Sequence, residues 1–212
     1  MYVYLSDNDS FSQTLISGII MTAQELLIEF SLVVDEIHQL YLDCSLGFVH
    51  NKKVMEDAQS KSVEKLGLSI THQDNLPVLF GVGAPGESTI LQQSTQKEFK
   101  LRNQRGGKNH ITLGNLCVVQ LYQYWEDHYR VELSTLLSLD KNAITSDFFG
   151  DLRLFRLSII HHKAIAKTNI NNCKILQWFS PGEVIVVSAE RIDHIFLMAK
   201  EEIKALQKKY CC

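Results

Sequence analysis

The longest regular pattern in the chain is an apolar stripe between Phe11 and Cys44. Its members are three or four residues apart, the spacing that puts side chains on one face of a helix. A stripe of this length needs apolar partners along its whole run, so the pattern predicts a bundle of helices. The stripe consists of Ile19, Ala23, Leu26, Phe30, Val33, Ile37, Leu40 and Cys44.

Further helices are expected later in the chain. One spans Leu113 to Leu137, with an apolar stripe on one side and polar residues on the other. Another begins near Ser146, whose hydroxyl caps the free amides of a first turn. The last follows Ser188 in the same way, after a short strand expected from Glu183 to Val187. The predicted fold class is therefore mostly α, a bundle of four to five helices with a short β segment.

Between Gly47 and His110 the apolar period fades, and prolines and glycines interrupt the chain. We therefore expect a loop-rich, irregular insertion at about residues 47–110, with short extended pieces at Val78 to Phe80 and Thr89 to Leu91. The insertion also concentrates cations, for which a solvated linker is favoured over a specific RNA clamp. The weak RNA-binding candidates among them are Lys100, Arg102, Arg105 and Lys108.

Length and composition narrow the class of protein. A chain of 212 residues with 45% apolar and 21% charged residues favours one globular domain, here residues 1–212. The net charge of -3 means that any nucleic-acid contact has to come from a local basic patch. The five cysteines form no CxxC pair, which suits a reducing compartment, and we expect the cytoplasm.

Several other classes are disfavoured by the sequence. The apolar segment from Leu15 to Val34 is interrupted by Gln24, Glu25 and Glu29, so no membrane helix is expected. Neither a Glu-x-x-His motif for a di-iron site nor a P-loop, a nucleophile elbow or an HExxH motif is present. We expect no metal and no cofactor.

The helix expected after Ser146 separates into a packing stripe and a polar set. Polar positions on this helix include Arg153 and Arg156, three residues apart, and His161 and His162 at the end of the run. Within one helix, Arg156 and His161 are about 140° apart around the axis and roughly 7.5 Å apart along it. A curled arginine or a second copy of the helix across a two-fold axis would bring them together, and the second copy makes better chemical sense.

An arginine, four to six residues and a histidine, late in a helix of an all-helical bundle, form the signature of the HEPN superfamily. The chain resembles this family because Arg156 to His161 matches with four residues between them. The stretches Phe149 to Arg156 and Tyr124 to Arg130 are also similar, and the resemblance covers about Asn115 to Phe179. The resemblance implies a HEPN-type bundle and a metal-independent endoribonuclease that acts as a homodimer. It also implies a role as a toxin or antiviral defence effector, with an antitoxin or defence-system protein as partner.

The chemistry implied by this resemblance is cleavage of RNA through its own 2'-hydroxyl. Such cleavage needs a base that titrates near neutral pH and a cation for the crowded phosphorane. His161 is the expected base, Arg156 would stabilise the transition state, and His161 of a second copy would protonate the leaving 5'-oxygen. The expected product end is a 2',3'-cyclic phosphate.

Supporting roles are expected for residues near the motif. Asp151 would orient a motif side chain, Arg153 would hold a neighbouring phosphate, and His162 would share proton transfer or lie at the surface. Glu126 and Arg130 are spaced for an i to i+4 salt bridge, with an active-site role as the alternative.

The rival function is a non-catalytic HEPN-like module that binds RNA or a protein partner. Leu157 favours it, because the family usually has a polar residue directly after the motif arginine. A second match to the spacing, Arg105 to His110, contains Gly106 and Gly107, which disfavour a rigid helix there. We assign that copy to the insertion.

Overall fold

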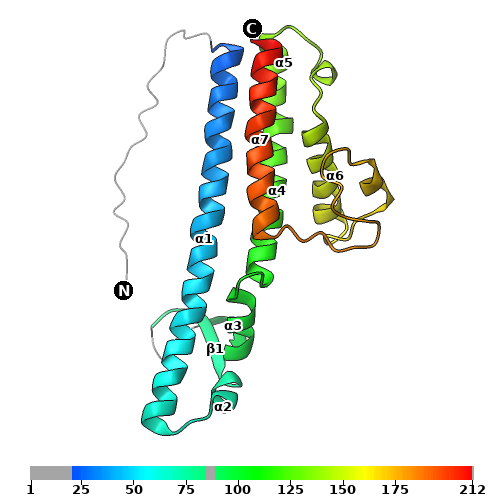
Figure 1. Cartoon of the computed structure of the whole chain (residues 1–212). Helices are drawn as coiled ribbons and strands as arrows, with labels where there is room; N and C mark the ends of the chain where they lie inside the picture. Colours follow the sequence, from blue (N-terminus) through cyan, green and yellow to red (C-terminus); the bar gives the residue numbers. More distant parts are fainter. Residues whose placement is uncertain (1–20, 85–88, 212) are drawn as a thin grey trace.

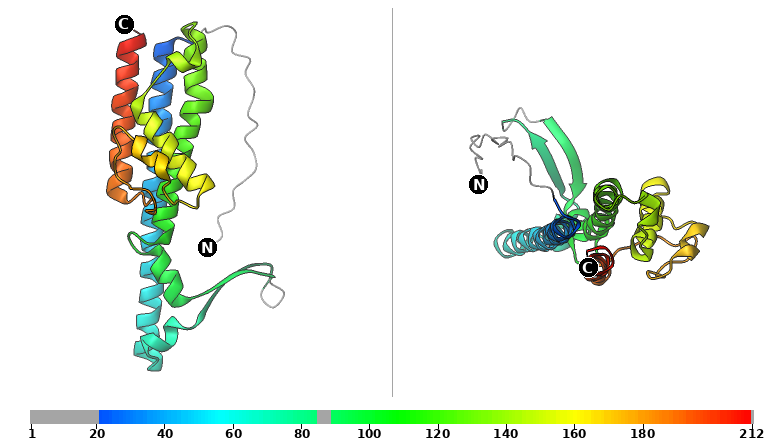
Figure 2. Two further views of the ribbon diagram at one scale, coloured as in Figure 1. Left: turned by 90° about the vertical axis from the view of Figure 1, so that its right-hand side faces the viewer. Right: turned by 90° about the horizontal axis from the view of Figure 1, so that it is seen from above.

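The structure is a computed structural model, and it describes residues 21–84 and 89–211. It confirms a mostly helical chain with one small antiparallel sheet of two strands. The long helix α1 (Ala23–Leu66) and the helices α4 (Lys108–Tyr124) and α7 (Ala189–Tyr210) lie side by side, and α6 (Asp147–His161) packs against α4 at the side of this group (Figures 1 and 2).

Helix α1 has a well-defined beginning and end. The Thr22 hydroxyl accepts a hydrogen bond from the amide of Glu25, and the Glu25 carboxylate accepts one from the amide of Thr22. Gly67 ends the helix in the left-handed conformation, with φ 67°. Ala23 to Cys44 of the expected stripe lies in this helix, whereas Phe11 and Ile19 lie outside the described residues.

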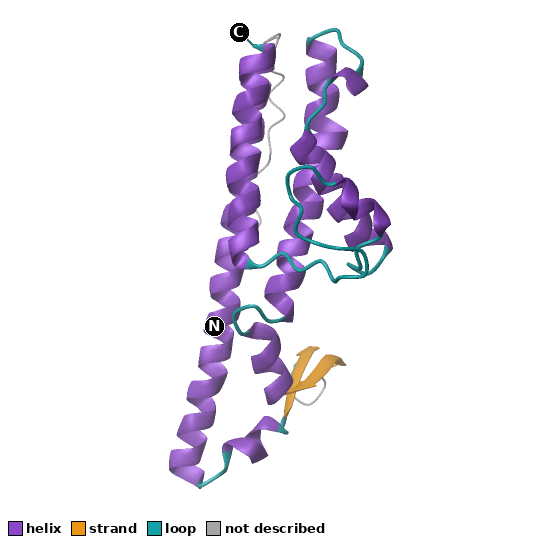
Figure 3. Cartoon of the chain, turned by 45° about the vertical axis from the view of Figure 1, so that its right-hand side comes forward, coloured by secondary structure: helices purple, strands orange, loops and turns teal. Residues whose placement is uncertain are grey.

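The expected irregular segment at 47–110 differs from the structure, since most of it is regular. Helix α1 continues to Leu66, and α2 (Ile70–Asp74), β1 (Pro77–Val82), β2 (Thr89–Thr95) and α3 (Gln96–Asn103) follow. The two extended pieces expected there are confirmed as the strands β1 and β2, which pair antiparallel as a hairpin (Figure 3). We call α1 beyond Gly47 together with α2, β1, β2 and α3 the distal arm.

A polar network holds the distal arm together. Gln59 of α1 is 2% exposed, and its Nε2 donates to Asp74 Oδ1 at 2.9 Å and to Gln96 Oε1 at 2.8 Å. Lys100 Nζ donates to Gln59 Oε1 at 2.8 Å and lies 2.7 Å from Asp74 Oδ1. Because the buried centre of the arm is polar, apolar periodicity does not reveal its helices.

The helix expected from Leu113 to Leu137 is present with a local change of pitch. After α4 the backbone forms a π-helical segment, Trp125–Tyr129, and then continues as α5 (Arg130–Leu136). Trp125 and Tyr129 both stack on Phe30 of α1, at ring-centroid distances of 6.0 and 4.3 Å. Trp125 also stacks on Phe149 of α6 at 4.3 Å, so this aromatic stack joins three helical layers.

The segment expected as a strand, Glu183 to Val187, makes only one isolated β-bridge, between Val184 and Ile165. Asn115 of α4 occupies backbone groups that a strand would offer to a neighbour. Its Nδ2 donates to the carbonyl of Ile185 at 3.1 Å, and its Oδ1 accepts from the amide of Val187 at 3.3 Å. The segment is therefore extended but is held by a helix side chain and not by a sheet.

The two later helices begin where the sequence predicts. The Ser146 hydroxyl accepts from the amide of Phe149 at the start of α6, and the Ser188 hydroxyl accepts from the amide of Arg191 at the start of α7. The apolar stripe of α7 is buried as expected. Within residues 21–84 and 89–211, no helix has the length and apolar character needed to cross a membrane.

Two helical glycines provide a matched test of this packing. A Cβ on Gly114 of α4 would lie 2.5 Å from the carbonyl oxygen of Val187, whereas a Cβ on Gly150 of α6 would meet nothing within 4 Å. We expect Gly114→Ala to lower the free energy of unfolding by about 1 to 2 kcal/mol through overpacking against backbone. Gly150→Ala should raise it by about 0.5 to 1 kcal/mol through helix propensity. Urea unfolding measures both, and equal effects would contradict the docking of Val187 on α4.

Candidate functional site

The motif residues lie on α6, the helix at the side of the bundle (Figure 1). Phe148, Leu152 and Phe155 of this helix are buried, which confirms the packing stripe at these positions. Arg156 is half-buried, and His161 is exposed as the last residue of the helix. Helical backbone connects the two, so their side chains leave α6 in different directions and no hydrogen bond joins them.

The Arg156 guanidinium is the unusual group of this helix. Its Nε is buried without a hydrogen-bond partner in the described part of the chain, and no acidic residue there forms an ion pair with it. A half-buried cation without a partner is unfavourable, because it loses hydration without gaining a counter-charge. An anion bound at this position would supply the missing partner.

A tight turn follows His161. Lys163 and Ala164 have φ angles of 52° and 62°, the left-handed region that residues other than glycine seldom occupy. The turn is held because the amide of Ala164 donates to the carbonyl of Ser158 at 3.0 Å and its carbonyl accepts from the amide of Ile185 at 2.7 Å. This bracing fixes the direction in which the end of α6 presents His161 and the exposed His162.

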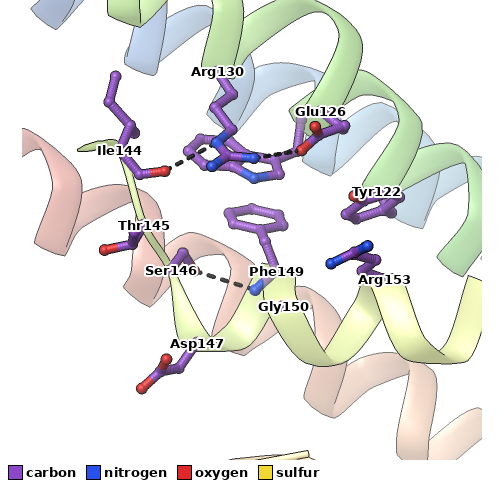
Figure 4. A pocket seen from close by; sticks show the side chains of 11 residues that line it. Tyr122, Glu126, Arg130, Ile144, Thr145, Ser146, Asp147, Phe149, Gly150 and Arg153 are labelled. Atoms are coloured by element: carbon purple, nitrogen blue, oxygen red, sulfur yellow. Dashed lines mark hydrogen bonds and ion pairs between the residues drawn. The ribbon is translucent and has the colours of Figure 1, made fainter. Parts of the chain in front are cut away.

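Three of the expected supporting residues meet in one pocket of about 260 Å³ (Figure 4). Glu126 and Arg130 reach it from the π-helical segment and α5, and Arg153 reaches it from α6. We call it the Glu126 pocket. Its other lining residues are Tyr122, Trp125, Ile144, Thr145, Ser146, Asp147, Phe149 and Gly150.

The Glu126 carboxylate is held by two cations. Arg130 Nη1 donates to its Oε2 at 2.8 Å, which confirms the expected i to i+4 salt bridge, and Lys141 Nζ lies 2.9 Å from its Oε1. Partial burial raises the pKa of Glu126, but the hydrogen bonds from Lys141 and Arg130 outweigh burial and bring its pKa below the ordinary value. Glu126 is therefore an ionised acceptor at neutral pH.

Arg130 and Arg153 differ in whether other residues already bind their guanidinium groups. Arg130 is committed to the fold, since its Nε also donates to the carbonyl of Ile144 at 2.9 Å. Arg153 is exposed and makes no salt bridge or hydrogen bond to any residue that the structure describes. Figure 4 shows its guanidinium beside Tyr122. The pocket thus combines a fixed carboxylate with a free cation.

Asp151 binds backbone amides and not the side chain of Arg156 or His161. It is 2% exposed, and its two carboxylate oxygens accept hydrogen bonds from three backbone amides at 2.7 to 2.9 Å. These amides belong to Lys174, Ile175 and Leu176, so Asp151 anchors the chain after α6 to the middle of that helix. The orienting role expected for Asp151 has no support in this geometry.

The expected RNA-binding cations lie on α3, in the turn between α3 and α4 and at the start of α4, apart from α6 (Figure 1). Lys100 belongs to the polar network around Gln59. The Arg102 guanidinium lies 4.9 Å from the ring centroid of Phe99, and its Nη1 donates to Ser94 Oγ. Only Arg105 and Lys108 of this set are exposed.

The second copy of the motif spacing, Arg105 to His110, crosses the break between α3 and α4, where Gly106 has a φ of 67°. This agrees with its assignment to the insertion. His110 itself is buried in the first turn of α4, and burial lowers its pKa. It borders a separate pocket with Ser45 and Asp193.

The sequence analysis gave no site role to Lys141 or Tyr122, and it did not predict that part of the stretch Tyr124 to Arg130 is π-helical. The only local signal for the pocket was the spacing of Glu126 and Arg130. A π-helical turn is not revealed by a search for the α-helical period of 3.6 residues, although such turns are frequent at functional sites. No group of three or more metal-ligating side chains is assembled among the described residues. No protein-family model, curated protein or solved structure matches the chain.

The anchoring role of Asp151 leads to a stability prediction. In Asp151→Asn one of the two acceptor oxygens becomes an NH2 group that faces backbone N–H donors. We expect the free energy of unfolding to fall by about 2 to 4 kcal/mol, because buried donors lose charged acceptors. The matched control is Asp147→Asn, whose exposed ion pair with Lys174 is screened by water, so its loss should change the free energy of unfolding far less. Chemical denaturation compares the two, and a similar small loss for both would refute the anchor.

Proposed function

We propose that the protein is a HEPN-type endoribonuclease whose reaction centre is the surface of α6 that carries Arg156 and His161. The observation that supports this proposal is the half-buried Arg156 guanidinium, which lacks a partner in the described residues. A phosphate diester of RNA is an anion that an arginine binds through two parallel hydrogen bonds. Binding it would relieve the unfavourable state of this cation.

His161 supplies the group that the reaction needs beside a phosphate-binding cation. As a base it would take the proton of the 2'-hydroxyl, whose oxygen then forms a bond to phosphorus. The bond from phosphorus to the 5'-oxygen breaks, and that oxygen receives a proton from a second histidine. The ends produced are a 2',3'-cyclic phosphate and a 5'-hydroxyl. Arg156 would stabilise the additional negative charge of the transition state.

A second copy of the chain is the proposed source of the second histidine. The separation of Arg156 and His161 on α6 disfavours a site in which one helix places both on one phosphate with an acid opposite them. Apolar side chains are also exposed near the end of α6: Ile160 is 48% exposed, and Ile165 and Val184, which share the β-bridge after the helix, are 40% and 57% exposed. A homodimer across this surface would bury them and pool two motifs.

The cellular role proposed with this activity is that of a toxin or antiviral defence effector in the cytoplasm, held in check by an antitoxin or defence-system protein. The rival is a HEPN-like module that binds RNA or a protein without cleaving. Leu157, an apolar residue where the family has a polar one, favours that rival. Cleavage and binding assays separate the two.

Cleavage of a single-stranded RNA in the presence of a chelator tests the proposed activity. We expect His161→Ala and Arg156→Ala each to slow cleavage by about 100-fold or more, because each removes a group that acts on the transition state. The matched controls are His50→Ala and Lys204→Ala, which change exposed residues on α1 and α7. Mass spectrometry should find a 2',3'-cyclic phosphate end. Wild-type cleavage that survives both motif changes would exclude the site, and RNA binding with no cleavage would establish the rival.

Light scattering at micromolar concentration tests the shared site. Wild type should have about twice the monomer mass. Ile160→Glu should give a monomer without cleavage activity, because it places a charge in the proposed apolar contact. Leu197→Glu, at a 64% exposed position of α7, is the matched control and should leave the dimer intact. A wild-type monomer that cleaves RNA would contradict the shared site.

A further inference from the structure

The Glu126 pocket lies directly beside the proposed reaction surface. Arg153 borders the pocket and precedes Arg156 by three residues on the same side of α6, about 4.5 Å along the helix axis. His161 follows at about 12 Å from Arg153 along that axis. A strand of RNA with one phosphate at Arg156 would therefore bring the neighbouring nucleotide to Arg153 and the pocket.

The volume of the pocket restricts what it accepts. At about 260 Å³ it is smaller than the roughly 300 to 1,000 Å³ of sites for drug-sized ligands. It therefore suits one small planar group and not an extended cofactor. Its floor is aromatic, since Trp125 and Phe149 stack on each other at 4.3 Å with an interplanar angle of 10°. Tyr122 adds a third ring at the wall.

The polar groups of the pocket have a definite pattern of acceptors and donors. The Glu126 carboxylate offers acceptor oxygens whose capacity exceeds the two hydrogen bonds that they already receive. Beside them the pocket is lined by the Arg130 guanidinium, which has five N–H donors, of which Nε and Nη1 already donate to Ile144 and Glu126. The two carboxylate oxygens are acceptors, and the nearby N–H group is a donor. They match a ligand whose edge has two adjacent hydrogen-bond donors followed by an acceptor.

Among the bases of RNA, guanine has this edge. Its N1–H and N2–H2 groups are adjacent donors, and its O6 is an acceptor beside them, whereas adenine, cytosine and uracil each lack two adjacent donors. Single-stranded RNA is generally recognised through such edges and through contacts with aromatic side chains. A partly buried, ionised carboxylate makes these hydrogen bonds strong.

We propose that the Glu126 pocket is the subsite for one unpaired guanine nucleotide of the RNA, with its base edge on Glu126 and its phosphate on Arg153. The assignment to RNA rests on the proposed function, whereas the guanine chemistry rests on the pocket itself. The subsite would make cleavage depend on a guanine next to the scissile phosphate.

Binding of mononucleotides tests the guanine chemistry without any cleavage. By calorimetry we expect wild type to bind guanosine monophosphate about tenfold tighter than inosine monophosphate, which lacks only the 2-amino group, and than adenosine monophosphate. Glu126→Gln should abolish this preference. Arg153→Ala should weaken all three nucleotides about tenfold but leave the nucleoside guanosine unaffected, and Lys204→Ala is the matched control.

The thermal midpoint of each variant, followed by circular dichroism, shows whether it folds. If the Glu126→Gln variant does not fold, two results still test the guanine subsite. They are the affinities of wild type for guanosine and inosine monophosphates, and the effect of Arg153→Ala on nucleotide binding. Equal affinity for the three mononucleotides, or no binding at millimolar concentration, would overturn the guanine subsite even if the enzyme cleaves RNA.

The binding assay with RNA uses the His161→Ala variant, so that the affinity for RNA is measured in the absence of cleavage. Two fluorescent oligonucleotides differ only in one guanosine replaced by inosine, and fluorescence anisotropy should show about tenfold weaker binding of the second. Equal RNA binding together with discrimination among mononucleotides would overturn the RNA assignment and identify a site for a free guanine nucleotide. Discrimination in both assays without cleavage by wild type would refute the proposed ribonuclease and leave the guanine subsite standing.

Discussion

The arrangement of the helices depends on the aromatic stack of Phe30, Trp125, Tyr129 and Phe149. Phe30 lies on Tyr129 and beside Trp125, and Trp125 lies flat on Phe149, so one set of rings connects α1, the π-helical segment and α6. Buried aromatic contacts of this kind combine a large apolar area with a preferred geometry. The same contact places the first half of α6 against α4 and thereby closes the Glu126 pocket on one side.

The charged residues of α6 and its neighbours divide into satisfied and unsatisfied groups. Asp151 has three backbone donors, and Glu126 has Arg130 and Lys141, so both carboxylates stabilise the fold. Arg156 and Arg153 have no such partner among the described residues. A half-buried cation without a counter-charge, such as Arg156, does not stabilise the fold, and a bound anion would supply the missing counter-charge. This contrast is the basis of the proposal that α6 binds RNA phosphates.

Expectations from the sequence failed where side chains replaced the usual backbone partners or where packing was polar. Asn115 takes the amide of Val187 and the carbonyl of Ile185, so the predicted strand has no sheet. The distal arm is helical beyond Gly47 because Gln59 gathers polar groups from α2 and α3. Neither arrangement produces an apolar period, which is the signal on which prediction from one sequence depends.

The sequence by itself determined the helices with apolar faces, the capping residues Ser146 and Ser188, the extended pieces at Val78 to Phe80 and Thr89 to Leu91, and the salt bridge of Glu126 with Arg130. These features are local, since they depend on residues a few positions apart. Only the tertiary structure decided that Asp151 serves the chain after α6, that Lys141 completes the charge of Glu126, and that Arg153 borders the pocket while Arg156 has no partner. These depend on contacts between residues far apart in the chain, and local patterns do not encode such contacts.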